Sequence, residues 1–288
     1  MEATTAKNVL KLLLKVAITI LCLWYVSRKI DWLLTWQLLK QSNKLWLLVA
    51  TLFYTASRFV FSFRLNIFFK NIGVHISEVS NFKLSWLGMF YNLFLPGGIG
   101  GDAYKVILLN RRNEVPVKKL SAAVVLDRIS GAAALSILSA IYYFFVYKGR
   151  FYSLALIVAI VPALVLYYFF IKKVFQSFLQ SIWTTLWLGL FVQLLQVVCT
   201  YCLLASIGIS HHYNEYIFLF LVSSIVAVLP FTIGGLGARE IVFLWGSEKF
   251  LLDTHQSIYV SLLFYLISVV IALIGIRWVY KDPLNDAN

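Results

Sequence analysis

Long apolar runs alternate with short polar stretches along most of the chain. Six runs have about the 20 residues that a helix needs to cross the hydrocarbon core of a bilayer. They cover residues 9–27, 45–69, 121–147, 151–171, 182–207 and 256–279. Two shorter runs cover 84–95 and 216–229. This pattern predicts an all-α, polytopic membrane bundle of about eight hydrophobic segments, in one domain over residues 1–288.

Both short runs end at a proline followed by glycines. Residues 95–101 and 229–235 share the pattern Leu-Pro-x-x-Ile-Gly-Gly. Proline removes a backbone donor and glycine loosens a helix, so both segments should stop there. Open backbone at membrane depth is tolerated only where it is buried in protein or lines a wet cavity. We therefore predict that both broken segments are re-entrant, and that a basic loop with Lys105, Arg111 and Lys119 follows the first.

The two breaks are 134 residues apart, and this offset also places run 45–69 on 182–207 and run 121–147 on 256–279. The chain is therefore interpreted as a repeat of residues 45–147 and 180–280, although a chance match of so short a pattern is the alternative. If the short segments are re-entrant and the N-terminus is cytoplasmic, the cytoplasmic loops hold the excess of Lys and Arg, as the positive-inside rule requires. In that topology the second unit crosses the membrane in the opposite direction to the first, and many secondary transporters have such inverted repeats.

Composition narrows the class of protein. Hydrophobic residues make up 61% of the chain and charged residues 13%, against about 25% in ordinary soluble domains. These values exclude a soluble enzyme and a disordered chain. The net charge of +13 is interpreted as basic loops at anionic lipid, with no nucleic-acid partner. No nucleophile with its base, P-loop or convincing metal cluster is visible, so we expect no catalytic residue, metal or cofactor.

Charged residues inside the predicted spans are the first candidates for function, because an ionised group is costly in a bilayer. Arg58 and the pair Asp127–Arg128 have this position. In the functional interpretation Arg128 binds an anionic headgroup, while Asp127 orients it or relays a proton. In the structural interpretation Asp127 pairs with Arg58. Arg64 lies nearer the end of its run, and we expect it to reach the interface as a structural residue.

The glycine-rich breaks are the second candidates. They can present backbone N–H groups to an anion, or they can simply permit tight packing. Charged residues that follow the breaks can gate the site or lock the loops. The predicted headgroup path therefore consists of Arg58, Gly97, Gly98, Gly100, Gly101, Asp102, Asp127, Arg128, Gly234, Gly235, Arg239 and Glu240.

Residues 90–102, the triplet Leu126-Asp127-Arg128 with Gly131, and residues 229–240 together resemble the flippase-like membrane region of lysylphosphatidylglycerol synthases. The resemblance covers nearly the whole chain and implies a multi-pass protein of a bacterial or archaeal inner membrane. In the full-length synthases this region is linked to moving aminoacylated lipid between leaflets. Their aminoacyl-transferring domain follows the membrane region. The chain ends at Asn288, so we expect no synthase activity from it.

The sequence thus predicts a flippase or transporter for an anionic or aminoacylated phospholipid or a polyprenyl-phosphate-linked lipid. Two alternatives stay open. One is a membrane-embedded headgroup transferase, with Asp102 and Glu240 as its acid and base. The other is a scaffold for a separately encoded transferase, which would then be a partner. Homo-oligomerisation is a further open possibility.

Overall fold

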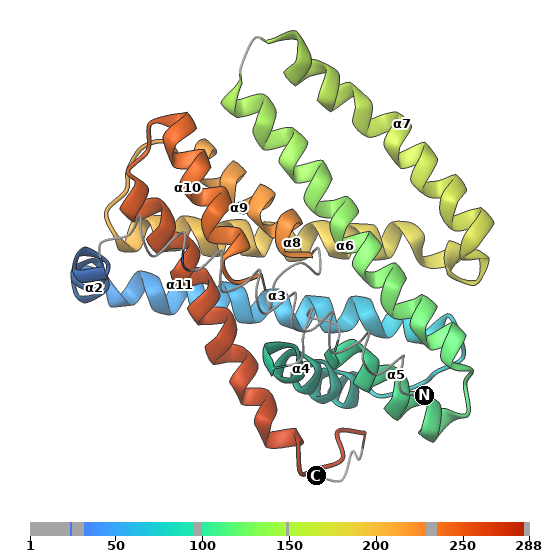
Figure 1. The fold of residues 1–288 in the computed structure, drawn as a ribbon. Coiled ribbons are helices and arrows are strands. Elements are labelled where there is room, and N and C mark those ends of the chain that lie inside the picture. Colours follow the sequence, from blue (N-terminus) through green and yellow to red (C-terminus); the bar gives the residue numbers. More distant parts are fainter. Residues whose placement is uncertain (1–23, 25–31, 95–99, 148–149, 229–234, 285–288) are drawn as a thin grey trace.

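A computed structural model describes residue 24 and residues 32–94, 100–147, 150–228 and 235–284. Every regular element in these ranges is helical, which confirms the predicted polytopic helical membrane bundle (Figure 1). Five of the six predicted full spans appear, and the sixth, at 9–27, lies outside the described residues. The five are α3 (Lys44–Lys70), α6 (Val117–Val146), α7 (Phe151–Val174), α8 (Ile182–Ser206) with the 3-10 turn η2 (Gln176–Ser181), and α11 (Thr254–Leu273) with η3 (Ile274–Trp278).

Helices α3 and α8 lie side by side in opposite directions at the centre of the bundle (Figure 1). At one end the Asn43 N–H, just before α3, donates to the carbonyl of Ser206, the last residue of α8, at 2.8 Å. At the other end the Asn71 side chain, just after α3, donates to Ser181, just before α8. The short helix α2 (Trp32–Gln41) precedes this pair.

The chain forms a second short helix after each break. Helix α4 (Glu78–Phe94) is followed by α5 (Gly100–Asn113), and α9 (Tyr213–Val228) is followed by α10 (Ala238–Phe250). The predicted basic loop after the first break is therefore wrong. Helix α5 buries Asp102, Lys105 and Leu109, which share one helical face. A half-polar face of this kind does not produce an apolar run.

The order of helices supports the predicted repeat. Helices α3, α4, α5 and α6 have 27, 17, 14 and 30 residues, and α8, α9, α10 and α11 have 25, 16, 13 and 20. Each unit therefore contains four helices rather than three segments. The antiparallel packing of the equivalent helices α3 and α8 is the arrangement expected of an inverted pair.

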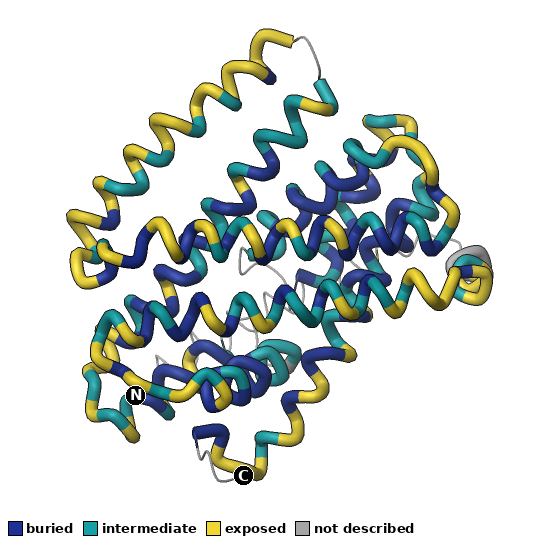
Figure 2. The backbone as a smooth tube through the Cα atoms, turned by 180° about the vertical axis from the view of Figure 1, so that it is seen from behind, coloured by how far each residue is buried: buried dark blue, intermediate teal, exposed yellow. Residues whose placement is uncertain are grey.

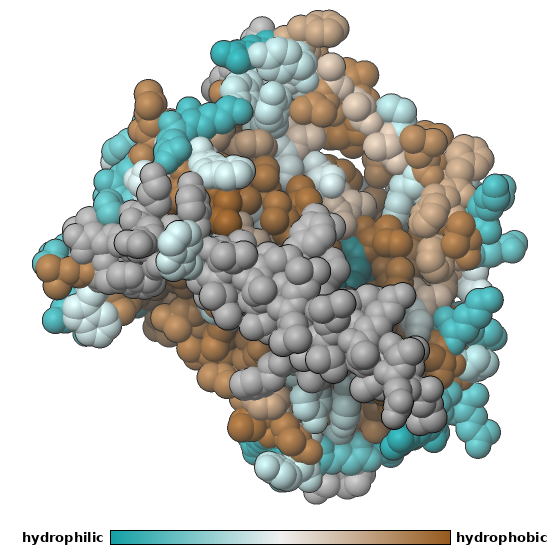
Figure 3. Space-filling model, in the orientation of Figure 1, coloured by the Kyte–Doolittle hydropathy of each residue, from teal (hydrophilic) through white to brown (hydrophobic). Residues whose placement is uncertain are grey.

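Helix α7 lies between the two units in sequence and on the outside of the bundle in space (Figure 2). It is the most apolar of the candidate spans and buries only Ser153 and Ile171. Hydrophobic residues also cover much of the face in Figure 3, with hydrophilic residues toward its edges. These outer surfaces suit contact with lipid chains, which leaves the interior for polar groups.

Candidate functional site

A cavity of about 320 Å³ lies within the bundle and takes residues from all eight helices of the two units. Among its described lining residues, basic side chains outnumber acidic ones by five to two. The basic residues are Arg58, Arg64, Lys105, Arg128 and Arg239, and the acidic residues are Asp102 and Asp127. This excess of positive charge favours an anionic guest, because opposite charges attract each other more strongly within a protein than in bulk water.

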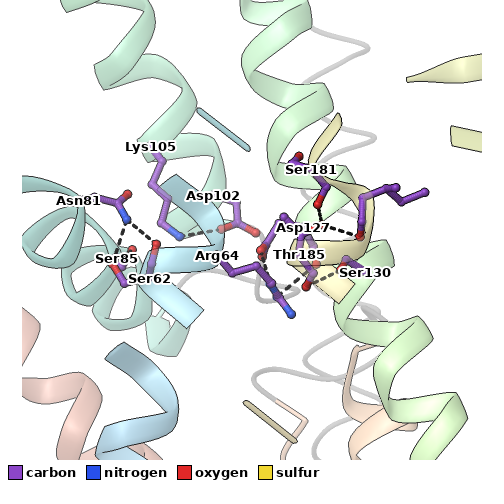
Figure 4. A network of polar contacts seen from close by, with 11 residues as sticks. Ser62, Arg64, Asn81, Ser85, Asp102, Lys105, Asp127, Ser130, Ser181 and Thr185 are labelled. Atoms are coloured by element: carbon purple, nitrogen blue, oxygen red, sulfur yellow. Dashed lines mark hydrogen bonds and ion pairs between the residues drawn. The ribbon is translucent and has the colours of Figure 1, made fainter. Parts of the chain in front are cut away.

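Asp102, in the first turn of α5, holds two of these cations (Figure 4 shows it with Lys105). One of its oxygens, Oδ1, is 3.2 Å from Lys105 Nζ. Its other oxygen, Oδ2, accepts bonds from Arg128 Nε at 2.7 Å and Nη2 at 2.6 Å. The positive end of the α5 dipole adds to the stabilisation of this carboxylate. Asp102 thus joins α5 to α6 through charge-assisted bonds.

Asp127 is paired with Arg64 and not with Arg58, which corrects the structural interpretation given above (Figure 4). Arg64 Nε donates to Asp127 Oδ1 at 2.8 Å, and Nη2 donates to the Asp127 carbonyl at 3.2 Å. The expectation that Arg64 reaches the interface is also wrong, because its side chain is only 3% exposed. Arg64 lies two helical turns beyond buried Ser57, on the inner face of α3.

Two glycines leave space for the Arg64 guanidinium. A Cβ atom at Gly189 of α8 would lie 3.0 Å from Arg64 Nη1, and one at Gly131 of α6 would lie 3.4 Å from Nη2. We call Arg64, Lys105 and Arg128, with Asp102 and Asp127, the carboxylate-paired cluster. It belongs entirely to the first unit, on α3, α5 and α6.

Arg58 and Arg239 have a different environment. The Arg58 guanidinium carbon lies 4.6 Å from the centre of the Tyr54 ring, and that of Arg239 lies 5.1 Å from the Phe264 ring. These two rings touch edge to face, with centroids 5.4 Å apart. Within the described residues, neither guanidinium forms a salt bridge. We call Arg58 and Arg239 the aromatic-backed pair.

Several buried polar atoms on the lining residues have no hydrogen-bond partner within the part of the chain that the structure describes. They are Arg58 Nε, Arg64 Nη1, Gln193 Oε1 and Ser224 Oγ. Buried polar atoms are normally bonded to protein, water or a ligand. Four of the eight such atoms in the described residues lie on residues of this one cavity.

The structure brings half of the predicted headgroup path into this cavity: Arg58, Asp102, Asp127, Arg128, Gly235 and Arg239. Gly100 begins α5, and Gly101 packs against α4, where an added Cβ would lie 1.9 Å from the Gly88 carbonyl oxygen. The other predicted path residues, Gly97, Gly98 and Gly234, lie outside the described residues.

Glu240 does not line the cavity and is fully buried. Its carboxylate accepts a bond from the Gly237 N–H at 2.7 Å and one from Ser261 Oγ at 2.8 Å. These bonds cap the N-terminal end of α10 and tie it to α11.

Sequence reasoning missed Lys105, Arg64, Gln193 and Ser224 as lining residues. A signal for Lys105 was present, because the 134-residue offset of the repeat places it on Arg239. Arg64 also carried a signal, as a charge inside the predicted span 45–69. Gln193 and Ser224 carry none, because the face that an uncharged residue occupies in an apolar helix depends on its neighbours in space.

These features define a polytopic helical membrane protein with a basic internal cavity. The chain belongs to the lysylphosphatidylglycerol synthase TM region family, whose sequence profile matches residues 12–275. This confirms the resemblance found in the motifs. A UPF0104 membrane protein of Pyrococcus horikoshii is 28% identical over 125 residues. That match covers 43% of this chain and 36%, about a third, of the relative's length.

Proposed function

We propose that this protein is a lipid flippase or transporter of the cell membrane. Its substrate is an anionic or zwitterionic phospholipid, aminoacylated forms included, or a polyprenyl-phosphate-linked lipid. The headgroup passes through the basic cavity while the hydrocarbon chains stay in the surrounding bilayer. The observation that carries the proposal is the excess of five basic over two acidic side chains in a cavity between apolar helices.

The physical argument concerns the cost of moving a charged headgroup through hydrocarbon. A single charged side chain at the bilayer centre costs about 2.5 to 3.5 kcal/mol on insertion scales. Basic side chains and unpartnered polar atoms can replace the water that the headgroup gives up on entry. The membership of a lipid-related membrane family supports the same conclusion.

The transferase alternative gains no support from the geometry. It requires Asp102 and Glu240 to face one reacting group. Asp102 lines the cavity, whereas both carboxylate oxygens of Glu240 accept bonds at the start of α10.

Lipid movement in vesicles tests the proposal. Purified protein is reconstituted with labelled phosphatidylglycerol, phosphatidylethanolamine or a polyprenyl phosphate, and the label reaching the opposite leaflet is measured. Arg128→Ala is compared with Arg150→Ala, whose exposed guanidinium lies over Tyr147 and Tyr152 outside the cavity. We expect a loss of about tenfold or more for Arg128→Ala, because a charge-assisted bond contributes about 1.5 to 3 kcal/mol.

The Arg150→Ala variant should move lipid at the wild-type rate. Gel filtration and thermal unfolding confirm that both variants are folded. Vesicles with wild-type protein that move none of the three lipids faster than empty vesicles would refute the transport function.

A further inference from the structure

The two groups of cations in the cavity differ in what already neutralises them. In the carboxylate-paired cluster, Asp102 bonds Lys105 and Arg128, and Asp127 bonds Arg64. In the aromatic-backed pair, the neighbours are the rings of Tyr54 and Phe264. A ring face compensates a positive charge only in part, and less than a carboxylate does. The aromatic-backed pair therefore retains the larger capacity for an anion.

We propose that Arg58 and Arg239 together form the binding site for a phosphate group of the transported lipid. This inference rests on the proposed function and assigns the part of the cavity that recognises the headgroup. Arg58 comes from α3 in the first unit and Arg239 from α10 in the second, so the bound phosphate bridges the two units.

The first argument is electrostatic. Burial is the main cost of the Arg239 charge, and repulsion from Arg58 adds a smaller part. The negative charge of Glu240 offsets part of this cost, but its two oxygens accept bonds from Gly237 and Ser261 and form no salt bridge with Arg239. An anion between the two guanidinium groups removes their repulsion and compensates both charges.

The second argument is the supply of hydrogen-bond donors. Arg58 Nε is buried and unpartnered, and guanidinium groups match phosphate oxygens with two parallel bonds. Ser224 lines the same cavity, is 5% exposed, and its unpartnered hydroxyl can also donate. A phosphate has enough oxygens to accept from both guanidinium groups and from this hydroxyl.

The third argument comes from the repeat. The 134-residue offset places Lys105 on Arg239, and both lie near the start of the helix that follows a break. Three residues earlier the first unit has Asp102, which bonds Lys105, and the second unit has Leu236. The offset also places Asp127 on Ser261. The second unit thus has no carboxylate at the two positions equivalent to Asp102 and Asp127, and its nearby Glu240 acts on Arg239 without a salt bridge.

Ligand-dependent thermal unfolding of the full chain in a non-ionic detergent tests this site without any transport. The probes are inorganic phosphate and dihexanoyl-phosphatidylglycerol, with dihexanoylglycerol as the phosphate-free control. Ionic strength is held constant with sodium chloride. We expect the unfolding temperature of the wild type to rise saturably with at least one phosphate probe and not with dihexanoylglycerol.

Arg58→Gln and Arg239→Gln should each raise the apparent dissociation constant about tenfold or more, since each removes a charge-assisted contact. Arg150→Gln, which removes a guanidinium over tyrosine rings outside the cavity, should bind like the wild type. If a Gln variant does not fold, Arg58→Lys and Arg239→Lys take its place. They keep the charge, lose the two-pronged geometry, and should show a smaller loss of affinity.

Stabilisation by inorganic phosphate would mean that the phosphate alone is recognised, and stabilisation by the lipid probe alone would mean that its glycerol or acyl parts are also needed. Both support the site. Absence of any phosphate-dependent stabilisation, or wild-type affinity in both arginine variants, would overturn it. Lipid movement in vesicles with wild-type affinity in the variants would remove this site while the transport function stands. Loss of binding in the variants, together with no lipid movement by the wild type, would support the phosphate site and remove the transport function.

Discussion

The carboxylate-paired cluster and the aromatic-backed pair show two ways of burying cations in one cavity. In the cluster, charge-assisted bonds connect α3, α5 and α6 of the first unit. In the pair, aromatic rings support Arg58 and Arg239 without neutralising them. The first arrangement uses its charges to hold helices together, whereas the second, in our proposal, binds a phosphate with them.

The largest effect that this comparison predicts is on stability. Arg64→Ala leaves the Asp127 carboxylate, 4% exposed, without its partner. Removing one member of a buried ion pair typically costs about 3 to 5 kcal/mol, because the remaining charge stays desolvated. We therefore expect Arg64→Ala to lower the free energy of unfolding by about that amount, measured by chemical denaturation in detergent.

The exposed pair of Lys70 and Glu78 is a matched control. Its N–O distance is also 2.8 Å, but its side chains are 47% and 40% exposed. Such a pair contributes about 0 to 1 kcal/mol, so Lys70→Ala should have little effect. The double variant Arg64→Ala with Asp127→Ala should recover part of the loss. Equal, small effects at Arg64 and Lys70 would mean that the cluster does not stabilise the fold.

The contrast between Arg64 and Arg58 also explains what the sequence could reveal. Long apolar runs predicted the spans, and the paired breaks predicted the repeat, because both depend on local composition. Arg58 was identified as a candidate cavity residue because a charge inside a run is conspicuous. The partner of Asp127 was wrong, because its pairing with Arg64 depends on the space that Gly131 and Gly189 leave between helices.

Helix α5 was missed for a related physical reason. Its buried face includes Asp102 and Lys105, so its sequence resembles a polar loop until their mutual pairing is known. Arg128 and Arg239 could be chosen without such knowledge, because one is a charge inside a predicted span and the other follows the second glycine-rich break.

A second, intermediate effect on stability is expected where α5 crosses α4 and where α10 crosses α9. A Cβ atom at Gly101 would lie 1.9 Å from the backbone oxygen of Gly88, so α5 must move away from α4. A Cβ atom at Gly246 would lie 2.0 Å from Leu219 Cδ2, which is the end of a flexible side chain. We expect Gly101→Ala to cost about 1 to 3 kcal/mol of unfolding free energy and Gly246→Ala less than that.

Thermal and chemical unfolding of both glycine variants measure this difference. Gly101→Ala should also reduce lipid movement, because Asp102 is its neighbour and the cluster would shift with α5. A greater loss of stability in Gly246→Ala would mean that the second crossing, and not the first, is the rigid one.

The smallest predicted effect is a gain in anion binding, and it tests the comparison most directly. Asp102→Asn keeps the shape of the side chain but removes the charge that neutralises Lys105 and Arg128. The cluster should then attract anions as the aromatic-backed pair does, and the affinity for inorganic phosphate should rise by up to about tenfold, or about 1.4 kcal/mol. The same thermal titration measures it. Combined with Arg58→Gln, the substitution should restore part of the lost binding, because the gain arises at a separate group of cations. A fall in affinity would mean instead that Asp102 positions Lys105 and Arg128 for the ligand, so that its carboxylate supports binding rather than opposing it.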